Sequence, residues 1–244
     1  MIREALQYIT GLKETSMKPE VLEINGKTYC TKDLHCYDQR TEIAESFKIN
    51  TLSGMVDYIK GKPEELRESM ILHIDSHRNI RLMSGLLKEK QREYLLVSAA
   101  IINEFNFDRW YDQERFLIEL QANFVKTDEL EVIAQVAGKV QAGTTTDYSD
   151  DGVSQKTTIK QGVERKDVLV PNPVALVPYR TFQEIEQPTS NFVFRIQEGD
   201  GEPHFKLVEA GNGIWKNEAM KSIKEYFERE LGDLLEERNI TIIA

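Results

Sequence analysis

Four of the chain's seven prolines lie in one segment, VPNPVALVPYRTFQEIEQPTSNFVFRI, which runs from Val170 to Ile196. Many of the residues around them are β-branched or aromatic and therefore favour strands. Proline has no backbone N–H to donate to a sheet, so it is found mainly on edge strands and at bends. The segment therefore predicts edge strands at the margin of a sheet, with FQEIEQ as a strand that ends at Pro188. A catalytic loop is the alternative interpretation.

Length and charge restrict the class of protein. A chain of 244 residues forms one large domain or two small ones. Its net charge of -10 disfavours binding to nucleic acid. No apolar run approaches the roughly 20 residues that span a bilayer, and the first residues do not read as a signal peptide. We therefore expect a cytoplasmic protein that contacts no membrane.

The cysteines and histidines do not predict a metal site. Cys30, His35 and Cys36 are close in sequence, but a structural zinc site needs four ligands, usually in pairs with C-x2-C or H-x3-H spacing. His73 and His77 have the i, i+4 spacing of a zinc protease motif, yet the glutamate of that motif is absent and the segment favours a strand. We predict reduced cysteines, solvated histidines and no bound metal.

The first third of the chain carries clear start and turn signals. Residues 1–14 predict a short helix, and VLEINGKTYCT predicts a hairpin because Asn25-Gly26 is the strongest two-residue hairpin signal. Thr51 is expected to cap a second helix that ends near Gly61.

Three β-prone runs follow, at residues 71–74, 80–83 and 94–100. They predict either a three-stranded antiparallel meander or a long two-stranded arm with a charged tip.

After these runs, the apolar residues repeat at the spacing of a helix. The pattern from Asp112 predicts either one long central helix or two helices joined at Lys126 and Thr127. Asp128 and Glu131 match a capping box for a second helix.

A β-rich half follows the expected stop at Gly143. Asp151-Gly152 predicts a hairpin, and residues 155–159 and 204–209 predict strands. NEAMKSIKEYFERELGDLLEER then predicts a helix, and ITIIA a final strand. The apolar face of that helix is Met220, Ile223, Phe227, Leu231 and Leu234.

These elements indicate an α+β fold with antiparallel strands and helices in separate runs. The predicted organisation is an N-terminal arm and hairpin at residues 1–49 and a main α+β domain at residues 50–244. The order of a β-arm, a long helix and a β-rich half is similar to that of HK97-type capsid proteins and encapsulins.

No catalytic signature is present, neither a nucleophile elbow nor a phosphate-binding P-loop nor a dinucleotide motif. The turn at Gly211–Gly213 either binds an anion at the start of a helix or is a tight turn. DYSDDG lacks the register of a calcium loop. Glu184 and Glu186 would share one face of a strand, either for acid–base work or as a charged edge. We expect no enzyme and no cofactor, with an unrecognised enzyme using Glu184, Glu186 or His204 as a lesser hypothesis.

Aromatic and arginine side chains are the stronger candidates for a site. Phe105, Phe107, Trp110 and Tyr111 precede the central helix and predict either a ligand cage or interface or a plug of the core. At the proline-rich margin, tyrosine, arginine and phenylalanine are typical interface anchors. The aromatic residues from Phe105 to Tyr111, together with Arg109, Arg180 and Arg195, suit bases and phosphates. The candidate ligand or interface residues are Phe107, Arg109, Trp110, Tyr111, Tyr179, Arg180, Phe182 and Arg195.

Several segments together resemble a phage and prophage family. They are FNFDRWYDQERFLIELQANFVKT, DDGVSQKTTIKQGV, the proline-rich segment and GIWKNEAMKSIKEYF. From about Asn50 to the end, the chain is similar to the uncharacterised family represented by the prophage protein YfdQ. The resemblance implies a phage or prophage origin and carries no reaction or catalytic residues.

Two functional hypotheses follow. The first is a non-enzymatic phage accessory protein that self-assembles into a homo-oligomer, with a shell as one form. The second is an anti-defence protein that sequesters a small anionic, nucleotide-like ligand.

Overall fold

The computed structural model describes residues 2–32, 43–63, 65–88, 90–140, 147–148, 155–161, 164–170 and 172–244. The chain divides into unit 1, Met1–Ile43, and unit 2, Ala44–Ala244. Some predicted features lie outside the described residues. They are His35 and Cys36, the helix stop at Gly143, the Asp151-Gly152 turn and Pro171.

Unit 1 consists of helix α1 (Ile2–Met17) and an antiparallel hairpin of β1 (Val21–Ile24) and β2 (Lys27–Cys30). Asn25 and Gly26 have φ values of 55° and 72°. Both lie in the left-handed region that a two-residue hairpin turn requires, which explains the Asn-Gly sequence. The predicted helix and hairpin are therefore confirmed.

A five-stranded sheet forms one part of unit 2, with the strand order β14-β4-β5-β6-β3. The strands are β3 (Phe47–Ile49), β4 (Met70–Ser76), β5 (Asn79–Ser84), β6 (Tyr94–Ala99) and β14 (Ile240–Ile243). The meander β4-β5-β6 is antiparallel, as predicted, and the alternative of a two-stranded arm is wrong. The two outer strands pair in parallel with their neighbours, which the sequence interpretation did not anticipate.

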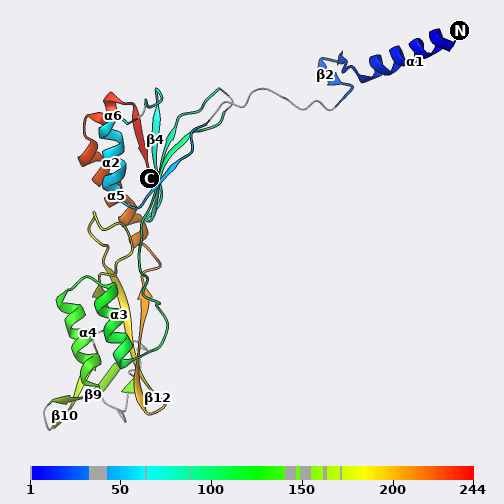
Figure 1. Cartoon of the computed structure of the whole chain (residues 1–244). Coiled ribbons are helices and arrows are strands. Elements are labelled where there is room, and N and C mark those ends of the chain that lie inside the picture. The colour runs from blue at the N-terminus through cyan, green and yellow to red at the C-terminus, as the bar shows by residue number, and fades with distance from the viewer. Residues whose placement is uncertain are drawn as a thin grey trace. The chain divides into compact units, whose positions relative to one another are not determined.

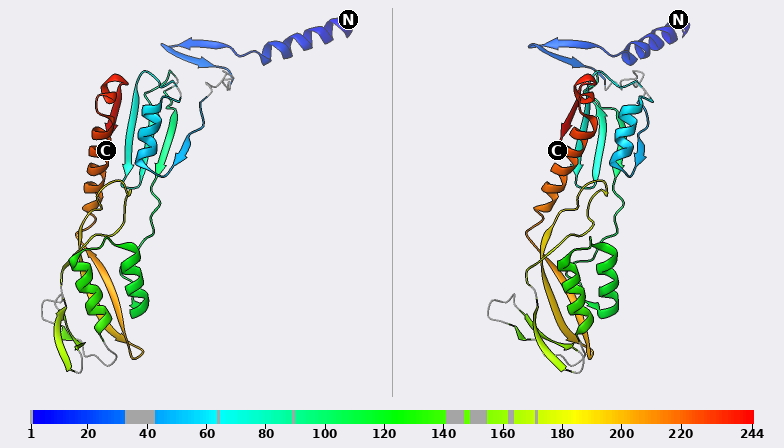
Figure 2. Two further views of the ribbon diagram at one scale, coloured as in Figure 1. Left: turned by 60° about the vertical axis from the view of Figure 1, so that its left-hand side comes forward. Right: turned by 90° about the vertical axis from the view of Figure 1, so that its left-hand side faces the viewer.

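Helices α2 (Leu52–Gly61) and α5 (Trp215–Leu231) lie on the same face of this sheet (Figures 1 and 2). The last predicted helix is shorter than expected, because Gly232 has a φ of 47° and ends α5. The short helix α6 (Leu234–Glu237) follows. We call the apolar cluster between sheet and helices the five-strand core. Its fully buried members include Leu52, Ile59, Leu72, Ile80 and Phe227.

The other part of unit 2 packs helices α3 (Gln113–Asn123) and α4 (Asp128–Lys139) against an antiparallel sheet. The sheet has the order β11-β12-β13-β7. Its strands are β7 (Tyr111–Asp112), β11 (Val174–Leu176), β12 (Ser190–Gly199) and β13 (Glu202–Ala210). The helical region is split, so the single long helix is wrong. Thr127 rather than Asp128 caps α4, since its side chain accepts from Leu130 N at 3.2 Å.

Stacked phenylalanines fill the interior of this second part. The ring of Phe116 on α3 lies 5.7 Å from that of Phe194 and 5.2 Å from that of Phe205, both nearly parallel to it. We call this cluster the phenylalanine core. Its phenylalanines are Phe105, Phe116, Phe124, Phe192, Phe194 and Phe205. Offset aromatic pairs add to the free energy gained by burying their area.

The proline-rich margin is an edge, as its prolines predict. Among the strands of the described residues, β11 pairs only with β12, and Pro173 and Pro178 lie near its two ends. Pro178 forms an isolated bridge to Phe124. The predicted strand FQEIEQ is wrong, because residues 181–189 form turns and irregular backbone. A further sheet contains β8 (Asp147–Tyr148), β9 (Gln155–Gln161) and β10 (Glu164–Val170).

The irregular backbone gives Glu184 a structural partner. Its carboxylate accepts from the backbone N–H of Leu52 at 2.8 Å and of Ser53 at 3.3 Å, at the start of α2. Thr51 caps the same turn by accepting from Gly54 N at 3.1 Å. Glu184 and Glu186 therefore do not form the paired face that a strand would give. A carboxylate at a helix N-terminus satisfies free donors and complements the helix dipole.

Within the described ranges, no helix combines the length and apolar character needed to cross a bilayer.

We predict that Glu184→Ala lowers the free energy of unfolding by about 1 kcal/mol, because α2 loses a cap supplied from a distant loop. Glu186→Ala is the matched control, since Glu186 is an exposed neighbour in the same loop. Urea denaturation followed by circular dichroism measures both variants. Equal midpoints for the two would contradict the assignment of Glu184 as a cap.

Candidate functional site

The loop after β11 holds Arg180 in a fixed position. Tyr179 N donates to Asn123 O at 2.9 Å, which ties the loop to the end of α3. The side-chain oxygen of Gln187 accepts from Arg180 N at 2.9 Å and from Thr181 N at 3.2 Å. Thr181 Oγ1 donates to His77 O at 2.6 Å, which joins the loop to the turn between β4 and β5. The loop therefore connects the two parts of unit 2.

The Arg180 side chain is buried, with 4% of the residue exposed. Its Nη1 donates to Glu209 Oε1 at 2.7 Å and to Ser190 Oγ at 3.2 Å. Burial lowers the pKa of Arg180, and the neighbouring Glu209 carboxylate opposes that effect. Arginine nevertheless remains charged in proteins, so this is a buried cation with one anionic partner.

Three aromatic rings surround the guanidinium. Its central carbon lies 4.4 Å from the ring centroid of Trp215, 5.2 Å from that of Phe192 and 5.3 Å from that of Phe107. Phe107 and Phe192 also stack on each other at 5.1 Å. A cation over the face of an aromatic ring is attracted by its quadrupole, and the attraction is stronger where water is absent. The rings thus offset part of the cost of burying this charge.

Three donors at this place have no acceptor among the described residues. They are Arg180 Nε, Arg180 Nη2 and Trp215 Nε1, and all three are buried. A buried donor without an acceptor costs about 1–3 kcal/mol. Ring contacts compensate for only part of this, because an aromatic face is a weaker acceptor than an oxygen.

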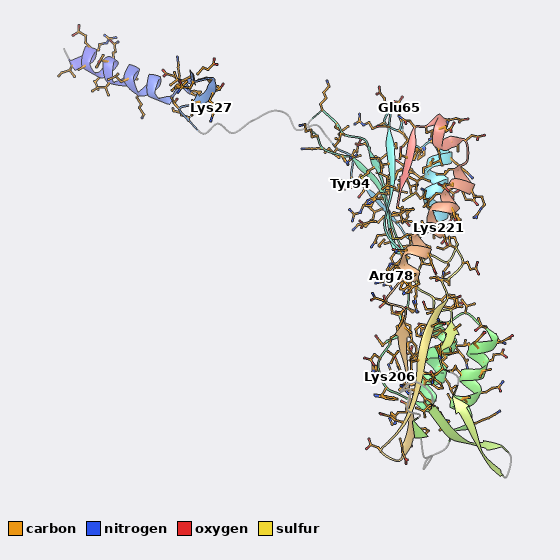
Figure 3. All side chains as sticks on the ribbon, turned by 180° about the vertical axis from the view of Figure 1, so that it is seen from behind. Lys27, Glu65, Arg78, Tyr94, Lys206 and Lys221 are labelled. Atoms are coloured by element: carbon orange, nitrogen blue, oxygen red, sulfur yellow. The ribbon has the colours of Figure 1, made fainter. Side chains whose placement is uncertain are left out.

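A pocket of about 320 Å³ lies beside these groups. Arg78 comes from the turn between β4 and β5 (Figure 3), Trp215 and Lys216 begin α5, and Glu209 lies on β13. The lining residues are His77, Arg78, Glu104, Phe105, Phe107, Pro178, Tyr179, Arg180, Glu209, Trp215 and Lys216. Elements of both parts of unit 2 therefore build one pocket, which we call the arginine pocket.

The charges of the arginine pocket favour an anion. Arg78 pairs with Glu104, and Arg180 pairs with Glu209. Lys216 has no carboxylate within 4.0 Å among the described residues, so its ammonium group is the remaining cation. No side chain caps the start of α5, where Lys216 lies, and the helix dipole adds positive potential there. The pocket is thus locally cationic in a chain of net charge -10.

His77 adds a neutral ring to the wall. Its imidazole meets the Trp215 ring edge-on at 4.7 Å. Burial, reinforced by the cations Arg78, Lys216 and Arg180, lowers the pKa of His77 to about 4. The imidazole is therefore uncharged at neutral pH.

The predicted site residues are brought together only in part. Phe107, Tyr179 and Arg180 line the arginine pocket, with Tyr179 exposed. Phe182 is buried in the five-strand core and is not presented to a neighbour. Arg195 is half-buried on β12.

The other members of the predicted aromatic run lie elsewhere. Tyr111 is buried in the phenylalanine core, which agrees with the interpretation of a core plug. Arg109 lies over the Tyr111 ring at 5.6 Å, and the Lys206 ammonium lies 4.8 Å from the centroid of Trp110. These contacts do not reach the arginine pocket.

Sequence reasoning missed most of the pocket's polar wall. His77 was predicted as a solvated histidine, and Arg78, Glu209, Trp215 and Lys216 were not considered. The nearest signal was the turn Gly211–Gly213 before a helix, because Trp215 and Lys216 follow it directly.

No metal centre emerges from the described residues, since none of their His, Cys, Asp and Glu side chains form a group of three or more.

Comparisons with family models, with curated proteins and with solved structures gave no match for this chain. The resemblance to the YfdQ-type family accordingly stays a prediction.

We predict that Glu209→Gln lowers the free energy of unfolding by about 3 kcal/mol, because it leaves the Arg180 charge buried without an anion. Glu202→Gln, at an exposed position of the same strand, is the control and should change little. Urea midpoints at neutral pH measure both. A midpoint for Glu209→Gln close to that of the control would show that the ion pair is not needed for folding.

We also predict that His77 titrates near pH 4 in the folded protein, measured by NMR of its ring. Between its ordinary value of 6.5 and about 4, the unfolded chain binds more protons at this residue than the folded chain. The contribution of His77 to the free energy of unfolding therefore falls as pH is lowered through this window. Replacing it by Gln should remove that contribution, whereas His73→Gln should not. A ring that titrates near 6.5 would contradict the packing described for His77.

Proposed function

We propose that unit 2 is a binding protein for a small anionic ligand that carries a flat ring, such as a nucleotide. The observation that carries this proposal is a set of three buried donors without acceptors among the described residues, Arg180 Nε and Nη2 and Trp215 Nε1, which belong to two residues that line one cationic pocket. Acceptor oxygens of an anion are the groups that such donors require.

The composition of the arginine pocket supports a ligand with two chemical parts. Lys216 and the guanidinium groups suit phosphate oxygens, because charge-assisted hydrogen bonds are the strongest of their kind. The exposed Tyr179 ring and the neutral His77 ring offer surfaces for a flat base. The pocket volume of about 320 Å³ is at the lower end of the range for small-ligand sites, which begins near 300 Å³.

The side chains that line the arginine pocket are suited to binding a ligand rather than to catalysing a reaction. Both carboxylates of the pocket are held in ion pairs with arginines, and neither is poised as a general base. The proposal agrees with the hypothesis of an anti-defence protein that sequesters a nucleotide-like ligand.

The test is isothermal titration calorimetry with four nucleoside monophosphates, a cyclic dinucleotide, adenosine and inorganic phosphate. We expect at least one nucleotide to bind at least tenfold more tightly than adenosine or phosphate alone, because both parts of the pocket are then used.

Lys216→Gln should weaken that binding by about tenfold or more, the effect of losing one charge-assisted hydrogen bond. Lys221→Gln, on an exposed turn of the same helix, is the matched control and should bind as the wild type does (Figure 3). Failure of every nucleotide to bind, or equal binding by both lysine variants, would refute the proposal.

A second candidate function is self-assembly into a homo-oligomer, and the lack of a core in unit 1 favours it. None of the described side chains of α1, β1 or β2 is buried. The HK97-type shell is the largest form of this proposal, although the split between α3 and α4 removes the single long helix on which that analogy depended. The native mass decides between these forms. A closed particle of many subunits supports a shell, a small oligomer supports self-assembly alone, and a monomer contradicts both.

A further inference from the structure

Unit 1 is too small and too exposed to be stable alone. Domains below about 40 residues usually need disulfides, metals or oligomerisation. Cys30 is a free, exposed cysteine, and the described residues contain no cluster of metal-binding side chains. A two-stranded hairpin such as β1-β2 is at best marginally stable in water. Packing against a further surface is the remaining route for this part of the chain.

Helix α1 carries a pattern that fits another helix. Ile2 and Ile9 occupy one position of a seven-residue repeat, and Ala5 and Leu12 occupy the position three residues later. We call these four residues the α1 stripe. Over these two repeats the spacing is the a and d arrangement of a coiled coil, with isoleucine at both a positions and Ala5 and Leu12 at the d positions. Isoleucine at a with leucine at d favours two-stranded pairing.

The α1 stripe is not covered by the other elements of unit 1. Ile2 is 80% exposed, Ile9 61% and Leu12 53%, and Leu6 beside them is also exposed. The opposite side of the helix is polar, with Gln7 and Thr10. A helix of 16 residues is marginal in water on propensity alone, and Gly11 weakens it further. Most of its stability must therefore come from covering the stripe.

The distribution of charge along the chain indicates which partner the α1 stripe can bind. Residues 1–43 contain six basic and seven acidic side chains, whereas the whole chain carries -10. Nearly all the excess negative charge thus belongs to unit 2, and two copies repel each other there but not at unit 1. Within α1, Arg3 and Lys13 balance Glu4 and Glu14, so the helix has no basic excess for an anionic membrane or nucleic acid.

We infer that α1 of one copy pairs with α1 of a second copy through the α1 stripe, and that this contact is the interface of a homo-oligomer. The inference rests on the proposed self-assembly and names the surface that produces it. It is independent of the arginine pocket, because no pocket residue lies in unit 1.

The test uses the full chain at micromolar concentration in sedimentation-velocity ultracentrifugation. Ile9→Glu combined with Leu12→Glu places two charges in the stripe. Gln7→Glu combined with Thr10→Glu adds the same charge to the polar side and is the matched control. We expect the wild type and the control to associate alike and the stripe variant to dissociate about 100-fold more readily, since unpaired charges would be buried.

Each other outcome counts against the inference. A monomeric wild type would overturn self-assembly and the α1 contact together. An oligomer that survives in the stripe variant would overturn the α1 contact alone and leave self-assembly through another surface. A wild type that stays monomeric but floats with anionic phospholipid vesicles, when the stripe variant does not, would assign the stripe to a membrane. Unchanged urea midpoints of unit 2 in both double variants exclude misfolding as the cause.

Discussion

The burial of the Arg180 charge is the constraint on which the architecture of unit 2 depends. Removing a guanidinium from water is costly unless charge and hydrogen bonds replace its hydration. The replacements come from distant parts of the chain, with Glu209 on β13, Phe107 before α3 and Trp215 at the start of α5. Elements of both parts of unit 2 thus meet around one cation. A charged contact of this kind fixes geometry more strictly than apolar packing, which tolerates rearrangement.

The elements set by local chemistry could be predicted from the sequence. The Asn25-Gly26 hairpin, the Thr51 cap and the meander of the five-stranded sheet all depend on neighbouring residues and on a short period. Prediction failed where a distant partner decided the outcome. FQEIEQ has the alternation of a strand, but Glu184 turns toward the start of α2 and Gln187 folds back on its own loop. The parallel pairing of β3 with β6 and of β14 with β4 was not predicted either, because no local sequence pattern indicates which strand will be the neighbour.

In the candidate site too, the features visible in the local sequence were predicted and those that depend on the fold were not. Aromatic density and the proline-rich margin led to Phe107, Tyr179 and Arg180, since unusual composition is visible locally. The same reasoning drew in Phe182, which the fold uses as core. Trp215 was not predicted as a site residue, because it lies outside the aromatic run and the proline-rich margin. Only the fold shows that its indole N–H lacks an acceptor beside a buried cation.

The parallel pairing of β14 with β4 has a consequence for synthesis of the chain. Ile240 to Ile243 join Met70 to His73, which leave the ribosome some 170 residues earlier. Until residue 243 has emerged, β4 presents an unpaired edge, and nascent chains with such edges are prone to aggregate. A chain that stops before Ile240 would keep most of the five-strand core and still expose that edge. The five-stranded sheet can therefore be completed only after residue 243 has been synthesised.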